Sequence, residues 1–151
     1  MSVALIGCGK SKRTGWKASG NYCIARSLYD PSPLFRKIVR YVESCPDKYK
    51  DWFVLSALYG LVAKDQIIEP YELTLSTFSQ EQLKVWSRKI FLSLQERGIT
   101  DVSFFCGSNY CNSYLLMLLD RHGIKYDLPM DGLSLGRRLS FLNKKSKIFL
   151  A

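Results

Sequence analysis

Short apolar runs alternate with longer segments of helical periodicity along this chain, and the alternation limits the folds it can adopt. The apolar runs predict strands at Ser2–Gly7, Trp52–Leu55, Asp101–Cys106 and Lys125–Leu128. Apolar residues at helical spacing predict the main helices at Ser32–Ser44, Ser79–Arg97, Asn112–Arg121 and Ser134–Lys144. Strands and helices that alternate in this way form α/β domains. We therefore expect a three-layer α/β domain with a mainly parallel central sheet of about four or five strands.

Capping residues mark where two of these helices begin. Ser32 stands directly before Pro33, a pairing of N-cap serine and first-turn proline that is typical of a helix start. Ser79 is followed three residues later by Gln82, which predicts a capping box. A further short helix is expected around Tyr22–Leu28.

The length and composition predict one domain that spans residues 1–151, with residues 144–151 as either a flexible tail or an edge strand. With 151 residues and 47% hydrophobic content, the chain can bury a core of ordinary size. No apolar run approaches the roughly 18 residues that a membrane-spanning helix needs. The N-terminus also lacks the charged and then apolar layout of a signal peptide. We expect a cytoplasmic protein with no membrane partner.

Cysteine and histidine usage argues against a metal site and predicts no cofactor. The five cysteines are an odd number and show no C-x-x-C spacing, so neither a disulfide framework nor a zinc site is expected. The single histidine, His122, lies at the predicted end of a helix, where a capping role is expected. Chemistry that needs two histidines is excluded for the chain by itself.

The charge balance favours an anionic partner. Lysine and arginine total 22 against 13 acidic residues, a formal net charge of +9. A strongly basic domain attracts polyanions, so we expect nucleic acid, with DNA preferred over RNA, and a small anionic nucleotide as the second candidate. A basic protein can also carry this charge for solubility alone, so the charge by itself does not establish an anionic partner.

The four predicted strands would bring four loops to one edge of the sheet. In an open parallel sheet, ligands bind outside the carboxyl ends of the strands. The loops that would meet there are Cys8–Lys12, Ser56–Gly60, Gly107–Tyr110 and Pro129–Gly132. Each carries small, polar or titratable residues, whereas the strands are mostly apolar. The sequence therefore predicts a functional site at this edge, provided that the strands are parallel.

The first of these loops is rich in glycine and basic residues. Cys8, Gly9, Lys10 and Lys12 follow the first strand directly. Exposed backbone N–H groups and a nearby lysine suit a phosphate. The loop is not a Walker motif, because Ala4 stands where that motif requires its first glycine.

The second loop combines tyrosines with a carboxylate. Gly60 can adopt a positive φ and turn the chain sharply after Tyr59. Pro70 restricts Glu69 to an extended conformation, and Tyr71 follows. We expect a rigid loop that presents tyrosine rings and one oriented carboxylate.

These motifs resemble those of a known superfamily. Ser56–Leu61, with the sequence SALYGL, and Pro70–Leu73, with the sequence PYEL, are similar to the signature of the YaaA-type peroxide-stress proteins. Ser108–Tyr110 resembles that superfamily's later Ser-Asn-x-Tyr element, and Cys8–Lys12 is more like its short, single-domain bacterial and phage members. The resemblance implies an α/β fold, nucleic-acid binding and a link to nucleobase chemistry through glycosylase-like activity and base-modification systems. The helix-hairpin-helix element of the long members has no counterpart in this sequence.

The leading hypothesis is an enzyme that acts on the N-glycosidic bond of a modified base, in the manner of a DNA glycosylase. Such an enzyme holds an extruded base against aromatic or apolar side chains. It also needs a carboxylate to stabilise the cationic sugar or to activate water, by analogy with glycoside hydrolysis. The catalytic candidates are Glu69 and Asp131, with Asp65 third. The expected binding residues are Cys8, Gly9, Lys10, Lys12, Ser56, Tyr59, Gly60, Tyr71, Ser108, Asn109 and Tyr110.

Two other functions remain open at this stage. A non-catalytic DNA- or RNA-binding module would need only the basic surface and the same loops. A small-nucleotide binder or hydrolase would use the Gly9-Lys10 loop. The identity of the base, the choice between DNA and RNA and the oligomeric state are not determined by the sequence.

Overall fold

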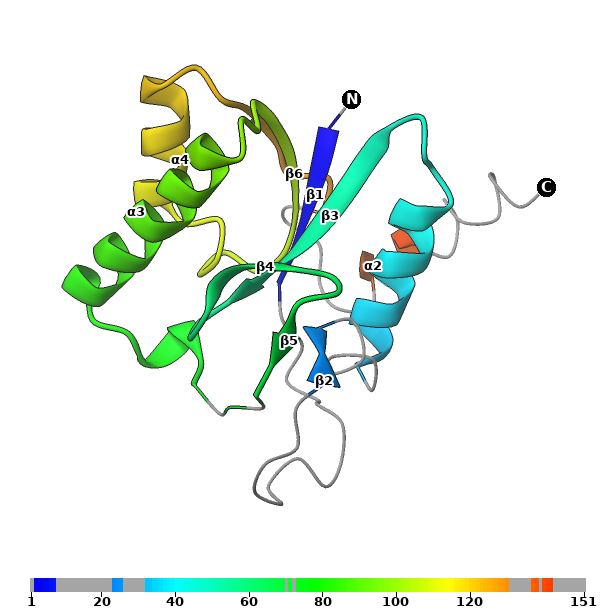
Figure 1. Cartoon of the computed structure of the whole chain (residues 1–151), viewed down its shortest axis with the longest axis horizontal. Helices are drawn as coiled ribbons and strands as arrows, with labels where there is room; N and C mark the ends of the chain where they lie inside the picture. The colour runs from blue at the N-terminus through cyan, green and yellow to red at the C-terminus, as the bar shows by residue number, and fades with distance from the viewer. Residues whose placement is uncertain are drawn as a thin grey trace.

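The computed structural model describes residues 2–7, 23–25, 32–69, 71, 73–130, 137–138 and 140–142. These residues form an α/β domain around a five-stranded sheet with the order β4-β3-β1-β6-β7 (Figure 1). The strands of this sheet are β1 (Ser2–Gly7), β3 (Tyr49–Ser56), β4 (Gly60–Ala63), β6 (Asp101–Phe105) and β7 (Lys125–Asp127).

Four of the five strands run parallel. β1 lies in the middle and pairs in parallel with both β3 and β6, so that Ile6 stands beside Val54 on one side and Phe105 on the other. β7 extends the parallel part beyond β6. The α/β class and the mainly parallel sheet that the sequence predicted are confirmed.

β4 is a strand that the sequence analysis did not anticipate. It pairs antiparallel with β3, and Ser56 stands opposite Gly60 at the closed end of this hairpin. Gly60 has a φ of 79°, a left-handed conformation that glycine adopts without the steric penalty of a side chain. The residues after Tyr59 were interpreted as a loop, because the sharp reversal was recognised but the pairing that follows it was not.

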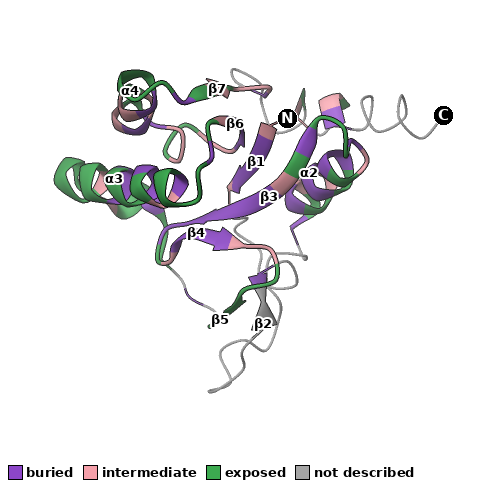
Figure 2. Ribbon diagram, turned by 45° about the horizontal axis from the view of Figure 1, so that its top comes forward, coloured by how far each residue is buried: buried purple, intermediate pink, exposed green. Residues whose placement is uncertain are grey.

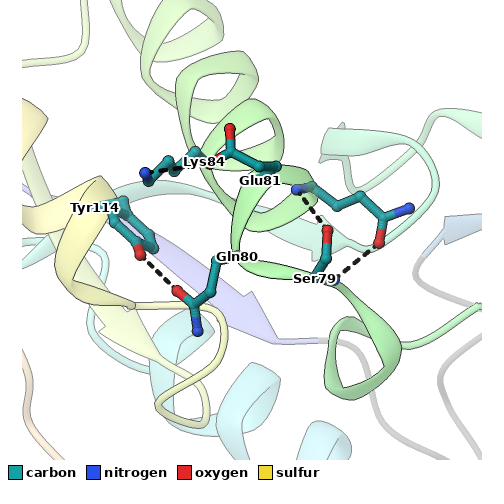
Figure 3. A network of polar contacts seen from close by, with 6 residues as sticks. Ser79, Gln80, Glu81, Lys84 and Tyr114 are labelled. Atoms are coloured by element: carbon teal, nitrogen blue, oxygen red, sulfur yellow. Dashed lines mark hydrogen bonds and ion pairs between the residues drawn. The ribbon is translucent and has the colours of Figure 1, made fainter.

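The longer helices begin where the sequence predicted. They are α2 (Pro33–Glu43), α3 (Gln80–Glu96) and α4 (Ser113–Arg121). The Ser32 hydroxyl accepts a hydrogen bond from the backbone N–H of Phe35, which makes Ser32 the N-cap of α2. Ser79 and Gln82 form the expected capping box at the start of α3. Nearby, the Tyr114 hydroxyl of α4 donates to the Gln80 side chain and ties the two helices together (Figure 3).

Side chains of the central strand alternate between two hydrophobic clusters. Ala4 and Ile6 belong to the cluster that contains the buried side chains of α2, whereas Val3 and Leu5 belong to the cluster that contains those of α3 and α4. Figure 2 shows β1 and β3 mostly buried, with the exposed residues of α3 on its outer surface. Burial on both sides explains why the strand reads as a continuous apolar run.

A second, two-stranded sheet corrects one predicted helix. β2 (Cys23–Ile24) pairs antiparallel with β5 (Ile67–Ile68). The helix expected around Tyr22–Leu28 is therefore wrong at Cys23 and Ile24, which form a strand. The backbone N–H of Ala25 also donates to the carbonyl of Gln66, at 2.9 Å. These long-range pairings outweigh local helical spacing. Figure 1 shows this small sheet near the carboxyl ends of β1 and β3.

Several predictions fall partly or wholly outside the described residues. Of the helix predicted at Ser134–Lys144, residues 137–138 and 140–142 are described, and all of them are helical. Residues 144–151 and the loop residues Cys8, Gly9, Lys10, Lys12 and Asp131 lie outside. Within the described part of the chain, no helix has both the length and the apolar character needed to cross a bilayer.

Candidate functional site

The topology places a switch point between β1 and β6. From β1 the chain continues to β3 on one side, and it later returns through α3 to β6 on the other side. Where strand order reverses in this way, the loops after the two neighbouring strands diverge and leave a crevice at their carboxyl ends. The sequence predicted a site at the carboxyl ends of the strands on condition that the strands are parallel, and this condition is met. The carboxyl edge is therefore the candidate location of a site.

A cavity of about 80 Å³ lies at this switch point. Its apolar wall consists of Leu34, Phe35, Ile38, Phe105 and Met130, and the backbone of Gly7 and Gly107 contributes at the strand ends. The polar or titratable side chains that line it are Ser32, Cys106, Tyr110 and Arg138. The cavity therefore presents a few polar groups on a mostly apolar wall, a composition that is common in ligand sites.

Gly7 allows the two strands to approach closely at the cavity. A Cβ atom at Gly7 would lie 2.8 Å from the Cβ of Cys106, closer than real side chains allow. The last residue of β1 must therefore be small for β6 to pack as it does. The next residue in the chain is Cys8, so the predicted phosphate loop leaves directly from the edge of the cavity.

Cys106 and Arg138 give the cavity its charge. Burial raises the pKa of the Cys106 thiol well above its ordinary value, and a hydrogen bond with Cys111 raises it further. The positive charge of Arg138 acts in the opposite direction and lowers that pKa, but it does not reverse the shift. At neutral pH the thiol is uncharged, and the guanidinium provides positive charge on the cavity wall.

Tyr110 is the one residue of the predicted binding set that lines this cavity within the described chain. Its half-buried ring packs edge-on against Trp86, with 5.9 Å between ring centroids, and its backbone N–H donates to Gly107. Ser108 and Asn109 precede it and are exposed. The Asn109 carbonyl accepts a hydrogen bond from the side chain of Asn112, the N-cap of α4. The loop after β6 is thus held in place by its own contacts.

The β3–β4 turn uses its polar groups internally. The buried Ser56 hydroxyl donates to the Tyr71 hydroxyl at 2.7 Å and accepts from the backbone N–H of Tyr59 at 3.0 Å. The Trp86 indole donates to the Ser56 carbonyl at 2.9 Å. Tyr71 is itself buried, and its ring packs edge-on against that of Tyr59. Ser56, Tyr59, Gly60 and Tyr71 come together as predicted, in an arrangement that stabilises the turn.

Glu69 is positioned by this turn. The Tyr59 hydroxyl accepts from the backbone N–H of Glu69 at 3.2 Å and donates to its carbonyl at 3.1 Å. Both backbone polar groups of Glu69 are therefore fixed, while its side chain is exposed. Glu69 does not line the switch-point cavity. The other predicted carboxylate, Asp131, is outside the described residues but directly follows Met130 of the cavity wall.

Comparison with known proteins gives one result. A family model described as a family of unknown function, DUF6884, matches residues 3–144. The chain belongs to the DUF6884 family. The match extends from β1 to beyond Arg138, so the switch-point cavity and the β3–β4 turn both lie within the DUF6884 domain. No curated protein and no solved structure is significantly similar to the chain.

Arg138, Cys106 and Ser32 are the cavity residues of this DUF6884 protein that sequence reasoning missed as site residues. Arg138 was recognised only as part of a basic helix, and nothing local indicated that this helix reaches the carboxyl edge. Cys106 was placed at the end of a strand, and Ser32 was interpreted as a helix cap, which it is. The one feature that would have indicated all three is their place at the β1–β6 switch point. That place depends on strand order, which the sequence analysis did not predict.

A second hollow of about 380 Å³ lies along α3 of the DUF6884 domain, lined mainly by Ala57, Phe78, Val85 and Trp86. Trp86 connects the two regions, because its ring also contacts Tyr110 of the switch-point cavity. Within the described part of the chain, no three histidine, cysteine or acidic side chains gather as metal ligands. His122 is the C-cap of α4, with its Nδ1 atom 2.9 Å from the Leu118 carbonyl oxygen.

Proposed function

We infer that this DUF6884 protein is a nucleic-acid-binding enzyme that acts on the N-glycosidic bond of a modified base, in the manner of a DNA glycosylase. The observation that carries the proposal is the switch-point cavity, which joins Arg138 and the Tyr110 ring on an otherwise apolar wall. A cation suits the phosphate of a nucleotide, and an aromatic ring suits its base. The proposal treats the domain as a three-layer α/β unit located in the cytoplasm.

Binding would be shared between the cavity and the loops around it. Arg138, together with Lys10 and Lys12 of the glycine-rich loop, would contact phosphate groups. The exposed Ser108 and Asn109 stand on the loop that carries Tyr110, where they could read base edges. The net charge of +9 supports a polyanionic partner, and we propose DNA rather than RNA.

Catalysis would depend on a carboxylate at the same edge. In the proposed reaction the bond between the base nitrogen and C1′ of the sugar breaks, and water adds to C1′. The base leaves with the bonding electron pair and takes up a proton, while the water loses one. A carboxylate stabilises the cationic sugar in the transition state or accepts the proton from water. Glu69 is the leading candidate because its backbone is fixed by Tyr59, and Asp131 is the second.

The size of the cavity favours one alternative. Sites for whole small-molecule ligands are commonly about 300–1,000 Å³, so a cavity of about 80 Å³ accepts one chemical group rather than a complete nucleotide. A small-nucleotide binder or hydrolase with its phosphate in the cavity is therefore the second proposal. If the protein binds nucleic acid but releases no base and hydrolyses no nucleotide, the remaining function is a non-catalytic DNA- or RNA-binding module.

Incubation of the protein with normal and base-modified phage DNA tests the proposal, with abasic sites and released base as the readouts. The proposal expects release from modified DNA, loss of release in Glu69→Gln or Asp131→Asn, and retained DNA binding in both variants. Glu96→Gln is the matched control, since Glu96 is an exposed carboxylate at the far end of α3. Absence of base release from every DNA tested would reject the enzyme and leave a binding protein.

A further inference from the structure

We propose that the switch-point cavity binds a single terminal phosphate group, carried by a nucleoside 5′-monophosphate or by the 5′ end of a nucleic-acid strand, and that Arg138 is the binding residue. The inference rests on the nucleic-acid- and nucleotide-binding part of the proposed function, because it assigns a ligand feature to the same site. It adds that recognition depends on a terminal phosphate monoester, beyond the internal diester backbone that any basic surface attracts.

The dimensions of the cavity support one group as its occupant. The volume is about 80 Å³, and residues at the ends of β1 and β6 and in the first half of α2 contribute to its wall. A base with its sugar would need a larger site. A terminal phosphate is compact and can enter while the rest of the ligand stays outside, next to Tyr110 and the loop that carries it.

The charge distribution supports an anion. Arg138 is the one charged side chain on the cavity wall within the described residues, and most of the other lining groups are apolar. Guanidinium groups bind phosphate oxygens through paired, charge-assisted hydrogen bonds. The Cys106 thiol, whose pKa is raised by burial, stays protonated at neutral pH and adds no opposing charge. A half-buried, apolar setting strengthens the attraction relative to bulk water.

The start of α2 adds to this effect. Its N-cap Ser32 lines the cavity, and its first turn contains no acidic residue that would neutralise the positive end of the helix dipole. Gly107 also lines the cavity, and its backbone has open space where a side chain would otherwise stand. The cavity thus combines a guanidinium, a serine hydroxyl and a helix start around one small volume.

The test compares ligands that differ only in the phosphate. Dissociation constants are measured by calorimetry for a nucleoside and its 5′-monophosphate, and for one single-stranded oligonucleotide with a 5′-hydroxyl or a 5′-phosphate end. We expect the phosphorylated partner of each pair to bind about 10- to 100-fold more tightly, the range for a charge-assisted hydrogen bond pair. A preference in only the nucleotide pair, or only the oligonucleotide pair, identifies the source of the phosphate.

Variants separate this cavity from general basic attraction. Arg138→Ala should abolish the preference for phosphate, and Arg138→Lys should retain part of it. Arg137→Ala is the matched control, because Arg137 is the exposed neighbour in the same helical segment and does not line the cavity. Arg137→Ala should weaken binding of the 5′-hydroxyl and the 5′-phosphate oligonucleotide equally. The ratio of their two dissociation constants should therefore stay unchanged. Circular dichroism confirms that each variant is folded, and Arg138→Lys keeps the test valid if alanine unfolds the protein.

Two results would overturn the inference. One is an equal affinity of the wild type for phosphorylated and unphosphorylated ligands. The other is a phosphate preference that survives in Arg138→Ala, or that acetate abolishes as effectively as inorganic phosphate, which would indicate a non-selective anion site. Because these measurements involve no turnover, they are independent of base release. A phosphate preference without base release would reject the glycosylase proposal alone.

Discussion

The β3–β4 turn and the switch-point cavity lie at the same edge of one sheet, yet their polar residues have different surroundings. In the turn, Ser56, Tyr59 and Tyr71 bond to one another, and Tyr59 also bonds to the backbone of Glu69. In the cavity, Arg138 and the protonated Cys106 stand on an apolar wall. The distinctive sequence motif thus forms the turn, whereas the residues that line the cavity come from less distinctive segments.

The difference predicts separate consequences for two tyrosines. Tyr71 is buried in the turn, so Tyr71→Ala should lower the free energy of unfolding by about 3–5 kcal/mol, the usual cost of removing a buried aromatic ring. Tyr110 is only half-buried, so Tyr110→Ala should cost less stability and reduce ligand affinity more. Urea denaturation and calorimetric titration of the two variants check this. A larger loss of stability in Tyr110→Ala than in Tyr71→Ala would contradict a structural role for the turn and a binding role for the cavity.

A smaller effect is expected from a single hydroxyl in the turn. Ser56→Ala removes the acceptor for the Tyr59 N–H and the donor to the Tyr71 hydroxyl, and should cost about 1–3 kcal/mol of unfolding free energy. Ser108→Ala, at an exposed position beside the cavity, should change stability by less than about 0.5 kcal/mol. Thermal unfolding of both variants distinguishes them. Equal stability of the two would contradict the role of Ser56 as a buried structural hydroxyl.

The smallest effect concerns the link between Cys106 and Arg138. Only the thiolate reacts with iodoacetamide, so the raised pKa of Cys106 should move its alkylation to a pH above that of an ordinary cysteine. Arg138 lowers this pKa, so Arg138→Ala should move the midpoint of the rate profile to still higher pH, whereas Arg137→Ala should not. Mass spectrometry of the Cys106 peptide over a pH series provides the measurement. A midpoint that stays constant or falls in Arg138→Ala would show that the Arg138 charge does not lower the pKa of Cys106.

The fold was largely predictable from local sequence because its signals are local. The continuous apolar run at Ser2–Gly7 and the caps at Ser32 and Ser79 were located correctly. β2 was mistaken for part of a helix, since its pairing with β5 joins residues more than 40 positions apart and leaves no periodic signal in a two-residue strand. Strand order, and with it the switch point, is also a long-range property that local patterns do not contain.

The site was predictable only in part, for the same reason. The carboxyl edge and Tyr110 followed from the expectation of parallel strands. Arg138 could not be assigned, because its position depends on how a C-terminal helical segment packs on the domain and brings Arg138 to the same cavity as residues of α2 and β6. For Glu69 the sequence predicted an oriented carboxylate, whereas the structure fixes only its backbone, through the Tyr59 hydroxyl, and leaves its side chain exposed.

The most direct test of the central claim is a nuclear magnetic resonance titration that maps ligand binding onto the sheet. A nucleoside 5′-monophosphate is added to ¹⁵N-labelled protein, and backbone amide shifts are followed residue by residue. We predict the largest changes at Gly7, Gly107, Tyr110 and the first turn of α2, with smaller changes around Ser56 and Tyr71. Changes centred on the α3 hollow, or on the amino ends of the strands near Tyr49 and Asp101, would contradict a ligand site at the carboxyl edge.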